Sequence, residues 1–249
     1  MSRISKAFKG KKALIVFIMA GDPSLAKTEQ LVYEIEAAGA DIIELGIPFA
    51  DSIADGVTIQ AAAMRSLKQG VSARDVIKLT SKIRKRSNIP IIFMTSFNIL
   101  YSYGLAKFVK DSVAAGVNGL IIPDIPVDEA DILKKNGLDL IFLAAPNSND
   151  EHIRMIAKKS SGFIYAVSIS GITGARKELH LQVNQVIKKI KGLTKTPVAI
   201  GFGISNPKQA AEASKLADGV IVGSAVIDVI AKKPKQVGKF VSSLKKAIG

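Results

Sequence analysis

Short apolar runs recur along the chain with amphipathic stretches between them, and each run has the length of a buried parallel strand. Eight such runs are found, at residues 15–19, 41–45, 91–94, 120–122, 140–143, 163–167, 198–200 and 220–222. Helical spacing predicts helices at 23–39, 71–86, 105–115, 129–135, 150–159, 183–191, 207–216 and 235–248. This alternation predicts an α/β fold, a (β/α)₈ TIM barrel, with a doubly wound open sheet as the alternative, because both are built from the same unit.

The pattern runs through the whole chain without a linker or a low-complexity stretch. We therefore expect one barrel domain over residues 1–249, a usual length for this fold. Ile4 and Phe8 are apolar residues that precede the first strand. They indicate an additional N-terminal helix that plugs the bottom of the barrel.

The segment 44–60 holds the most informative acidic residues. Glu44 lies near the carboxyl end of the second apolar run and has apolar neighbours on both sides, so we expect its side chain in or beside the core. Asp51 and Asp55 follow on an irregular loop. A carboxyl group on a rigid strand facing a second one on a loop is suited to general acid–base catalysis. Asp51 is equally well explained as a solvated surface charge.

The predicted carboxyl ends of the strands, where barrels place their active sites, carry neither lysine nor histidine. This argues against a Schiff-base aldolase, a histidine base and a histidine-held metal. The two histidines, His152 and His180, fall on a helix and in a loop. Asp22 and Asp124 are further candidate acids, but turn residues beside both of them suggest that they cap backbone amides instead.

Glycines follow the last three strands in the positions where barrels bind phosphate. Gly203 comes after the seventh strand, Gly223 and Ser224 come after the eighth, and a glycine pair at 171 and 174 follows the sixth. Backbone N–H groups and the N-terminus of a short extra helix bind the anion in such sites. Three aromatic side chains near strand ends could line a slot for a flat substrate, namely Phe17, Tyr165 and Phe202.

Composition narrows the remaining possibilities. The net charge is +14, but the lysines are spread over most of the expected helices and no nucleic-acid motif accompanies them, so we expect no nucleic-acid partner. The positive charge could attract anionic substrates. No apolar run reaches the length of a membrane span, and the chain has no cysteine, so a cytoplasmic protein without disulfides or thiolate metal sites is expected.

Taken together, these motifs resemble the tryptophan synthase α subunit family. The resemblance runs in order through the whole chain, and its motifs are Ala20-Gly-Asp-Pro23, Glu44-Leu-Gly-Ile-Pro-Phe49, Ala54-Asp-Gly56, Ile59-Gln60, Pro123-Asp-Ile-Pro126, Ala145-Pro-Asn147, Tyr165, Gly171-Ile-Thr-Gly174, Gly201-Phe-Gly-Ile-Ser205 and Gly223-Ser-Ala225. It implies retro-aldol cleavage of indole-3-glycerol phosphate to indole and glyceraldehyde 3-phosphate.

The resemblance also implies roles for individual residues. Glu44 would be the general acid/base, Asp55 would hold the indole N–H, and Thr173 would steady Asp55. The phosphate would be held by Gly174, Gly203, Gly223 and Ser224, and the indole slot would be lined by Phe17, Ile121, Tyr165, Phe202 and Ile221.

The family's α chain works with a pyridoxal-phosphate β subunit, as a heterotetramer of two α and two β subunits, and passes indole to it. No cofactor is expected on this chain. The usual Ser-Asp-Pro of the family is Ala50-Asp51-Ser52 here, and a common proline is Val57. Losing these prolines leaves the loop less restricted when unbound. This departure motivates an alternative, a regulatory subunit that binds a phosphorylated ligand with weak or no catalysis.

Overall fold

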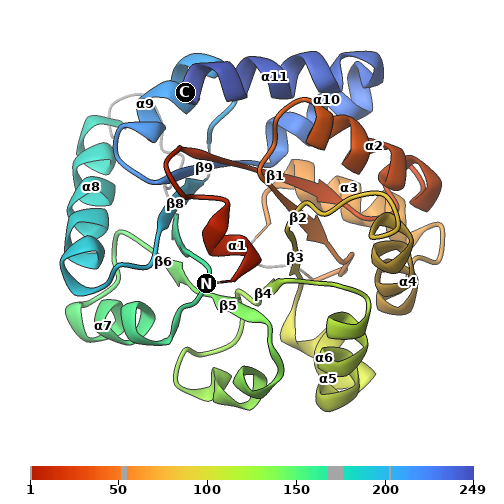
Figure 1. The fold of residues 1–249 in the computed structure, drawn as a ribbon, viewed down its shortest axis with the longest axis horizontal. Helices are drawn as coiled ribbons and strands as arrows, with labels where there is room; N and C mark the ends of the chain where they lie inside the picture. The colour runs from red at the N-terminus through yellow and green to blue at the C-terminus, as the bar shows by residue number, and fades with distance from the viewer. Residues whose placement is uncertain (1, 52–54, 168–175, 202) are drawn as a thin grey trace.

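The computed structural model describes residues 2–51, 55–167, 176–201 and 203–249. Nine parallel strands form one sheet in the order β5-β4-β3-β2-β1-β9-β8-β7-β6, which curls into a barrel with helices outside it (Figure 1). The strands are β1 (Ala13–Met19), β2 (Ile42–Gly46), β3 (Ile91–Met94), β4 (Gly119–Ile121), β5 (Asp139–Ile141), β6 (Leu143–Ala144), β7 (Ile164–Val167), β8 (Val198–Gly201) and β9 (Gly219–Val222).

The two ends of this sheet are consecutive in the chain, and this closes the barrel. Strands β5 and β6 are separated only by Phe142; β5 pairs with β4, whereas β6 pairs with β7. The carbonyl oxygen of Phe142 accepts a hydrogen bond from the Tyr165 amide at 3.0 Å. The fifth predicted strand therefore exists as two short pieces that bridge the sheet ends. The predicted barrel is confirmed, and the open sheet is not formed.

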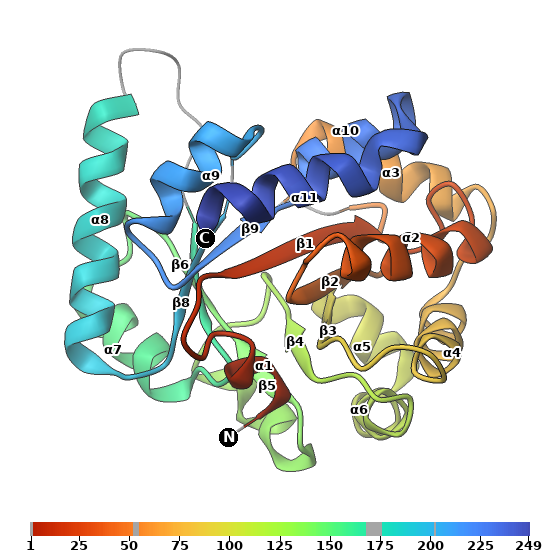
Figure 2. The ribbon, with the colours of Figure 1, turned by 45° about the horizontal axis from the view of Figure 1, so that its top comes forward.

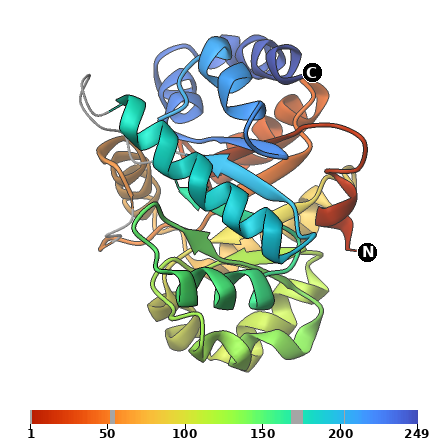
Figure 3. The same ribbon diagram turned by 90° about the vertical axis from the view of Figure 1, so that its left-hand side faces the viewer.

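Helices cover the outside of the strands; in Figure 3 the long helix α8 lies across the barrel wall. The structure contains a helix in each range that the sequence predicted. These helices are α2 (Leu25–Ala37), α4 (Ala73–Ile83), α6 (Leu105–Ala114), the 3₁₀ helix η1 (Glu129–Asn136), α7 (Asp150–Lys159), α8 (Arg176–Leu193), α9 (Pro207–Ser214) and α11 (Val237–Ile248). Three α-helices had no predicted range, α3 (Val57–Leu67), α5 (Phe97–Tyr103) and α10 (Ser224–Lys232), nor did the short 3₁₀ turn η2 (Pro234–Gln236).

Alternation along each strand sends side chains to opposite faces of the sheet, where they join different apolar clusters. In β1, Leu14, Val16 and Ile18 belong to the apolar layer between strands and helices. Ile15, on the opposite face, packs inside the barrel with residues from the neighbouring strands. Since successive side chains of a strand point to opposite faces, the position of each residue in its strand decides whether it can reach the barrel interior.

A short N-terminal helix, α1 (Arg3–Lys6), closes the lower end of the barrel, as the sequence predicted (Figure 2). Ile4 is fully buried and Phe8 nearly so, both within the inner core. The Phe8 ring lies 5.6 Å from that of Phe163, centroid to centroid. Gly119 and Gly219 leave room for them, because a Cβ atom there would lie 2.8 Å from Ile4 Cδ1 and 2.7 Å from Phe8 Cε1. The opposite end is left for a site.

Candidate active site

Glu44 points into the barrel because of its place in β2. Its neighbours Ile43 and Leu45 belong to the outer apolar layer, so Glu44 lies on the inner face. The strand register sets it beside Phe17 of β1 and Ile92 of β3. Only 1% of Glu44 is exposed. The sequence thus placed this carboxyl group correctly in the core.

The surroundings of Glu44 disfavour its ionised form. Its Oε2 atom is buried and accepts no hydrogen bond from the described residues. Burial, and then the negative charge of Asp55, raise the pKa of Glu44 to about 8. At neutral pH the side chain is therefore mostly a neutral acid that can donate a proton.

Glu44 and Asp55 line the same cavity, although 11 positions separate them in the sequence. Asp55 lies on the loop before α3, whose N-cap is Gly56, and is half-buried. The cavity holds about 690 Å³, within the usual range for a site that binds a small molecule. Its other described lining residues are Phe17, Gly56, Ile59, Met94, Tyr165, Val167, Gly203, Ile204, Ser205, Ile221, Gly223, Ser224, Ala225, Asp228, Val229 and Phe240.

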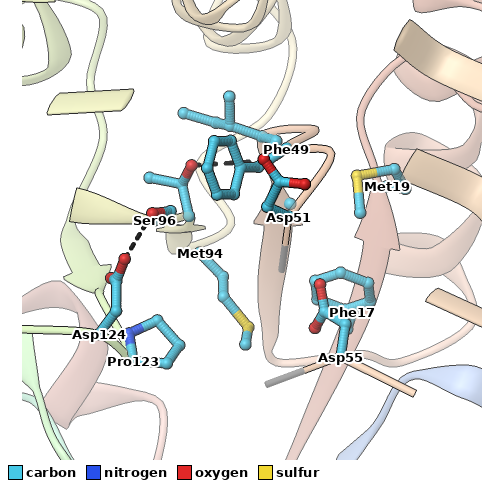
Figure 4. A pocket seen from close by; sticks show the side chains of 12 residues that line it. Phe17, Met19, Phe49, Asp51, Asp55, Met94, Ser96, Pro123 and Asp124 are labelled. Atoms are coloured by element: carbon cyan, nitrogen blue, oxygen red, sulfur yellow. Dashed lines mark hydrogen bonds between the residues drawn. The ribbon is translucent and has the colours of Figure 1, made fainter. Parts of the chain in front are cut away.

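A smaller cavity of about 210 Å³ adjoins this one (Figure 4). Phe17, Asp55 and Met94 line both cavities and so form a wall between them. In Figure 4, Asp55 and Phe17 lie on one side of the smaller cavity, with Pro123 and Asp124 on the other. Asp55 can therefore contact a ligand from a position between the two spaces.

Glycines at strand ends make room for the aromatic side chains of the site. A Cβ atom on Gly46 would lie 2.8 Å from Cζ of Phe17, and one on Gly201 would lie 2.4 Å from the Tyr165 hydroxyl oxygen. Burial, followed by the negative charges of Glu44 and Asp55, raises the pKa of Tyr165 well above its usual range. Tyr165 is therefore a neutral phenol within the cavity wall.

One part of the lining of the large cavity is suited to an anion. Helix α10 begins there with Ser224. Its N-cap is Gly223, which has no side chain that could accept a hydrogen bond from the first N–H groups of the helix. Gly203 has a φ of 73°, a conformation that favours glycine, and lies on the neighbouring loop. The first N–H groups of a helix have no partner within it and carry a partial positive charge. Backbone donors and a hydroxyl group thus meet at one place, as in phosphate sites.

The predicted residues fall into three groups. Glu44, Asp55, Phe17, Tyr165, Gly203, Ile221, Gly223 and Ser224 line the large cavity. Ile121 is buried in the barrel core with Tyr165 and Ile221 and does not line the cavity. Thr173, Gly174 and Phe202 lie outside the described residues, as does Ser52.

Sequence reasoning did not single out Met94, Ile59 or Val167, which also line the cavity. Met94 and Val167 are the last residues of β3 and β7, so the strand-end rule could have found them. Ile59 lies on α3, which had not been predicted, and only the motif containing it was noted.

The two other candidate acids have partners outside the large cavity. Both carboxylate oxygens of Asp22 accept hydrogen bonds from the guanidinium group of Arg65, at 2.8 and 2.7 Å. Asp124 accepts a hydrogen bond from the backbone amide of Phe97 at 2.8 Å, and the Ser96 hydroxyl donates another. The expected backbone cap thus holds for Asp124, whereas Asp22 forms an ion pair.

Within the described residues there is no group of three or more His, Asp or Glu side chains that could hold a metal ion. Across the same part of the chain, no helix is both long enough and apolar enough to cross a membrane.

Comparison with known proteins agrees with this geometry. A family model described as "Tryptophan synthase alpha chain" matches residues 4–248. The chain belongs to the tryptophan synthase α chain family. The tryptophan synthase alpha chain of Thermoanaerobacter sp. (strain X514) is 45% identical over 263 residues, covering 100% of both chains. That of Dehalococcoides mccartyi (strain ATCC BAA-2100 / JCM 16839 / KCTC 5957 / BAV1) is 43% identical over 254 residues, again covering 100% of both.

Solved structures of tryptophan synthase share the fold. The α subunit from Legionella pneumophila str. Paris superposes with a TM-score of 0.89 at 33% identity, covering 100% of this chain and 98% of that chain. Tryptophan synthase from M. tuberculosis in its aminoacrylate-bound form gives a TM-score of 0.91 at 30% identity, with 100% of both chains covered. Tryptophan synthase α chains are lyases of tryptophan biosynthesis that cleave indole-3-glycerol phosphate. Nothing in these comparisons supports the alternative of a regulatory subunit with little catalysis.

Proposed function

We propose that Glu44 and Asp55 carry out the retro-aldol cleavage of indole-3-glycerol phosphate in the large cavity. The observation that carries this proposal is that both carboxyl groups line one cavity, with Glu44 buried at its inner wall. The raised pKa of about 8 supports a proton-donating role for Glu44 at neutral pH.

In the first step, the Glu44 carboxyl group donates its proton to C3 of the indole ring. The electron pair of the C2–C3 double bond forms the new C–H bond, and the ring nitrogen becomes part of a positively charged iminium group. In the second step, the Glu44 carboxylate removes the proton of the hydroxyl group on the carbon attached to C3. A carbonyl group forms, the carbon–carbon bond breaks, and its electrons restore the indole ring. Glu44 ends protonated, as it began.

Asp55 stabilises the charge that develops in the first step. A carboxylate beside the ring N–H accepts its hydrogen bond, and this bond strengthens as the nitrogen becomes positive. In a cavity with little water the interaction is stronger than in bulk solvent. Thr173 would steady Asp55, as the family resemblance implies.

The substrate lies with its indole ring towards Glu44 and its phosphate towards α10. Gly203, Gly223 and Ser224 bind the phosphate through backbone N–H groups and a hydroxyl group, together with Gly174. Phe17, Tyr165 and Ile221 would line the ring slot with Phe202, as the resemblance implies, and Ile121 would support them from the core cluster that it shares with Tyr165 and Ile221. The lining of the cavity supports this orientation, because it includes both proposed catalytic carboxyl groups and the glycine and serine at the start of α10.

We further propose that the reaction needs neither a metal ion nor a Schiff base. The described residues that line the cavity include no lysine that could form an imine and no histidine. The chain would act in the cytoplasm as the α subunit of a heterotetramer of two α and two β chains, and the β subunit would hold pyridoxal phosphate and receive the indole.

Indole release from indole-3-glycerol phosphate, measured with and without a β subunit, tests this function. We expect Glu44→Gln to abolish turnover while the protein still binds the substrate. Asp139→Asn is a matched control, because Asp139 also has a buried carboxylate oxygen without a hydrogen-bond partner among the described residues but lies at the start of β5, at the opposite end of the barrel. A folded wild-type protein that releases no indole in either assay, or a Glu44→Gln variant that remains active, would overturn the proposal.

A further inference from the structure

Helix α3 begins at Val57, two residues after Asp55, and its N-terminal end lies at the surface. Its N-cap, Gly56, offers no side-chain hydrogen bond, and Val57 at its first position is 82% exposed. The buried residues of the helix are the small side chains Ala62, Ala63 and Ser66. Apolar packing alone therefore stabilises α3 weakly, since burial energy scales with the apolar area removed from water.

The C-terminal half of α3 is instead held by the turn that follows β1. The Arg65 guanidinium group donates two hydrogen bonds to the carboxylate of Asp22, from Nε at 2.8 Å and from Nη2 at 2.7 Å. The Ser66 hydroxyl donates to the Ala20 carbonyl at 2.6 Å. The Gln69 side-chain amide donates to the Gly21 carbonyl at 3.1 Å. Three successive turn residues thus bind one face of the helix.

The ion pair is the strongest part of this contact. The Asp22 side chain is 4% exposed, whereas that of Arg65 is 42% exposed. The bond to Asp22 raises the pKa of Arg65. Two parallel N–H···O bonds fix the orientation of the guanidinium plane as well as its distance, which a lysine cannot do.

The helix and the turn also approach each other closely. Gly21 has a φ of 85°, and a Cβ atom there would lie 2.4 Å from the Ser66 hydroxyl oxygen. There is no space for a side chain between the two elements, so a shift of α3 towards or away from β1 would disrupt several contacts at once.

The same helix is bonded to the backbone of Asp55. The Gln60 side-chain amide, in the first turn of α3, donates to the Asp55 carbonyl at 2.9 Å. The turn that contains Asp22 follows β1, and β1 pairs with β2 so that Phe17 lies opposite Glu44. Asp55 is thus linked through α3, Asp22 and β1 to the strand that carries Glu44.

We propose that the Arg65–Asp22 ion pair is a positioning element for the lyase reaction: it fixes α3 against the end of β1 and thereby sets the place of Asp55 relative to Glu44. The inference rests on the catalytic roles proposed above for these two carboxyl groups. Neither Asp22 nor Arg65 lines the large cavity, so they act through Asp55 rather than on the substrate.

Steady-state kinetics of Arg65→Lys and Asp22→Asn, at pH values from 6 to 10, test the proposal. Misplacing a catalytic group by about 1 Å costs up to roughly 100-fold in rate, so we expect kcat to fall about 10- to 100-fold. KM should change less than about threefold, because the phosphate-binding loops are untouched. Combining both substitutions should add little further loss, since each breaks the same pair.

The pH profile separates positioning from a general loss of structure. The charge of Asp55 helps to raise the pKa of Glu44, so a displaced Asp55 should move the alkaline limb of kcat/KM to lower pH. Gln60→Leu provides a second route to the same shift without leaving a buried charge unpaired. Lys82→Gln is the matched control, because it breaks the 2.7 Å ion pair between Lys82 and Glu29 elsewhere on the surface.

The outcomes are distinguishable. The proposal is supported if the Arg65, Asp22 and Gln60 variants lose kcat and shift the alkaline limb while Lys82→Gln behaves like wild type. It is overturned if wild type is active and Glu44→Gln is inactive, yet the three variants keep both kcat and the pH profile of wild type. A loss of kcat with an unmoved alkaline limb in the folded variants also overturns it. An inactive wild-type protein would instead contradict the proposed function itself.

Discussion

At the scale of single residues, the position of Glu44 follows from the alternation of one strand. The sequence predicted a carboxyl group in the core because Ile43 and Leu45 flank it, and the structure buries it on the inner face of β2. Its pairing with Asp55 could not be derived from local pattern, because the distance between two side chains across a loop depends on the path of that loop. The residue pattern offered both Asp51 and Asp55 as loop carboxyl groups, and the family resemblance selected Asp55.

The raised pKa of Glu44 makes stability depend on pH. Its folded-state value of about 8 exceeds the ordinary 4.5, so the unfolded chain ionises first as pH rises. The stabilising effect of the bound proton is complete below about pH 4.5 and is lost as pH rises to about 8. Relative to wild type, Glu44→Gln should therefore gain roughly 3 kcal/mol in free energy of unfolding between pH 5 and pH 8.

Urea unfolding of both proteins at several pH values measures this difference. Ile132→Ala, which removes no ionisable group and changes a residue that is 58% exposed, serves as the control and should show no such trend. A difference between Glu44→Gln and wild type that stays constant from pH 5 to pH 8 would show that Glu44 ionises normally in the folded protein.

Gly201 is needed because the Tyr165 hydroxyl group occupies the space beside it. An alanine Cβ would lie 2.4 Å from that oxygen, so the ring must move into the cavity or the strands must shift. We expect Gly201→Ala to cost about 1–3 kcal/mol of stability and to raise KM for the substrate. In Gly192→Ala, on α8, the new methyl group meets nothing within 4 Å, so KM should stay unchanged there. If the two variants had equal KM values, the expected clash between the new methyl group at residue 201 and the Tyr165 hydroxyl group would be wrong.

At the scale of elements, the strength of the apolar stripe separates α4, which the sequence predicted, from α3 and α5, which it did not, although α10 also had no predicted range and buries Val226, Ile227 and Ile230. Helix α4 buries Val76, Ile77, Leu79 and Ile83, a spacing that is plain in the sequence. Helix α3 buries only small residues, and α5 buries Leu100 alone, so their periodicity is faint. Tertiary contacts such as the Arg65–Asp22 pair replace the missing apolar face, and such contacts are not visible in a local window.

The N-terminal plug is an element that should contribute stability without affecting chemistry. Ile4 and Phe8 fill the inner core at the end opposite the site. We expect Ile4→Ala to lower the free energy of unfolding by about 2–5 kcal/mol and Phe8→Ala by about 3–5 kcal/mol. Below the unfolding transition, kcat and KM should remain within about twofold of wild type. Ile132→Ala, at a residue that is 58% exposed, should leave both stability and kinetics unchanged.

At the scale of the whole molecule, the sequence predicted the repeating unit, and the structure decided how the sheet ends. A barrel and an open sheet use the same strands and helices, so their difference lies in whether the first and last strands of the sheet meet. Here they meet through Phe142, whose carbonyl oxygen accepts from the β7 amide while β5 pairs with β4. That closure brings the carboxyl ends of the strands to one rim, which gathers residues from β1, β2, β7 and β9 around one cavity.

The charge of the whole molecule should influence substrate capture. The chain carries a net charge of +14, and the substrate ends in a phosphate group, so the field of the protein attracts it over distances that salt can screen. Raising the ionic strength from about 0.01 M to about 0.5 M shortens the Debye length from roughly 30 Å to about 4 Å. We expect KM to rise several-fold while kcat changes less than about twofold, because the chemical step takes place within the cavity.

Product inhibition provides the matched control: inhibition by glyceraldehyde 3-phosphate should weaken with salt, whereas inhibition by uncharged indole should not. If salt weakens both equally, or leaves KM unchanged, the excess of lysines has no part in capturing the substrate.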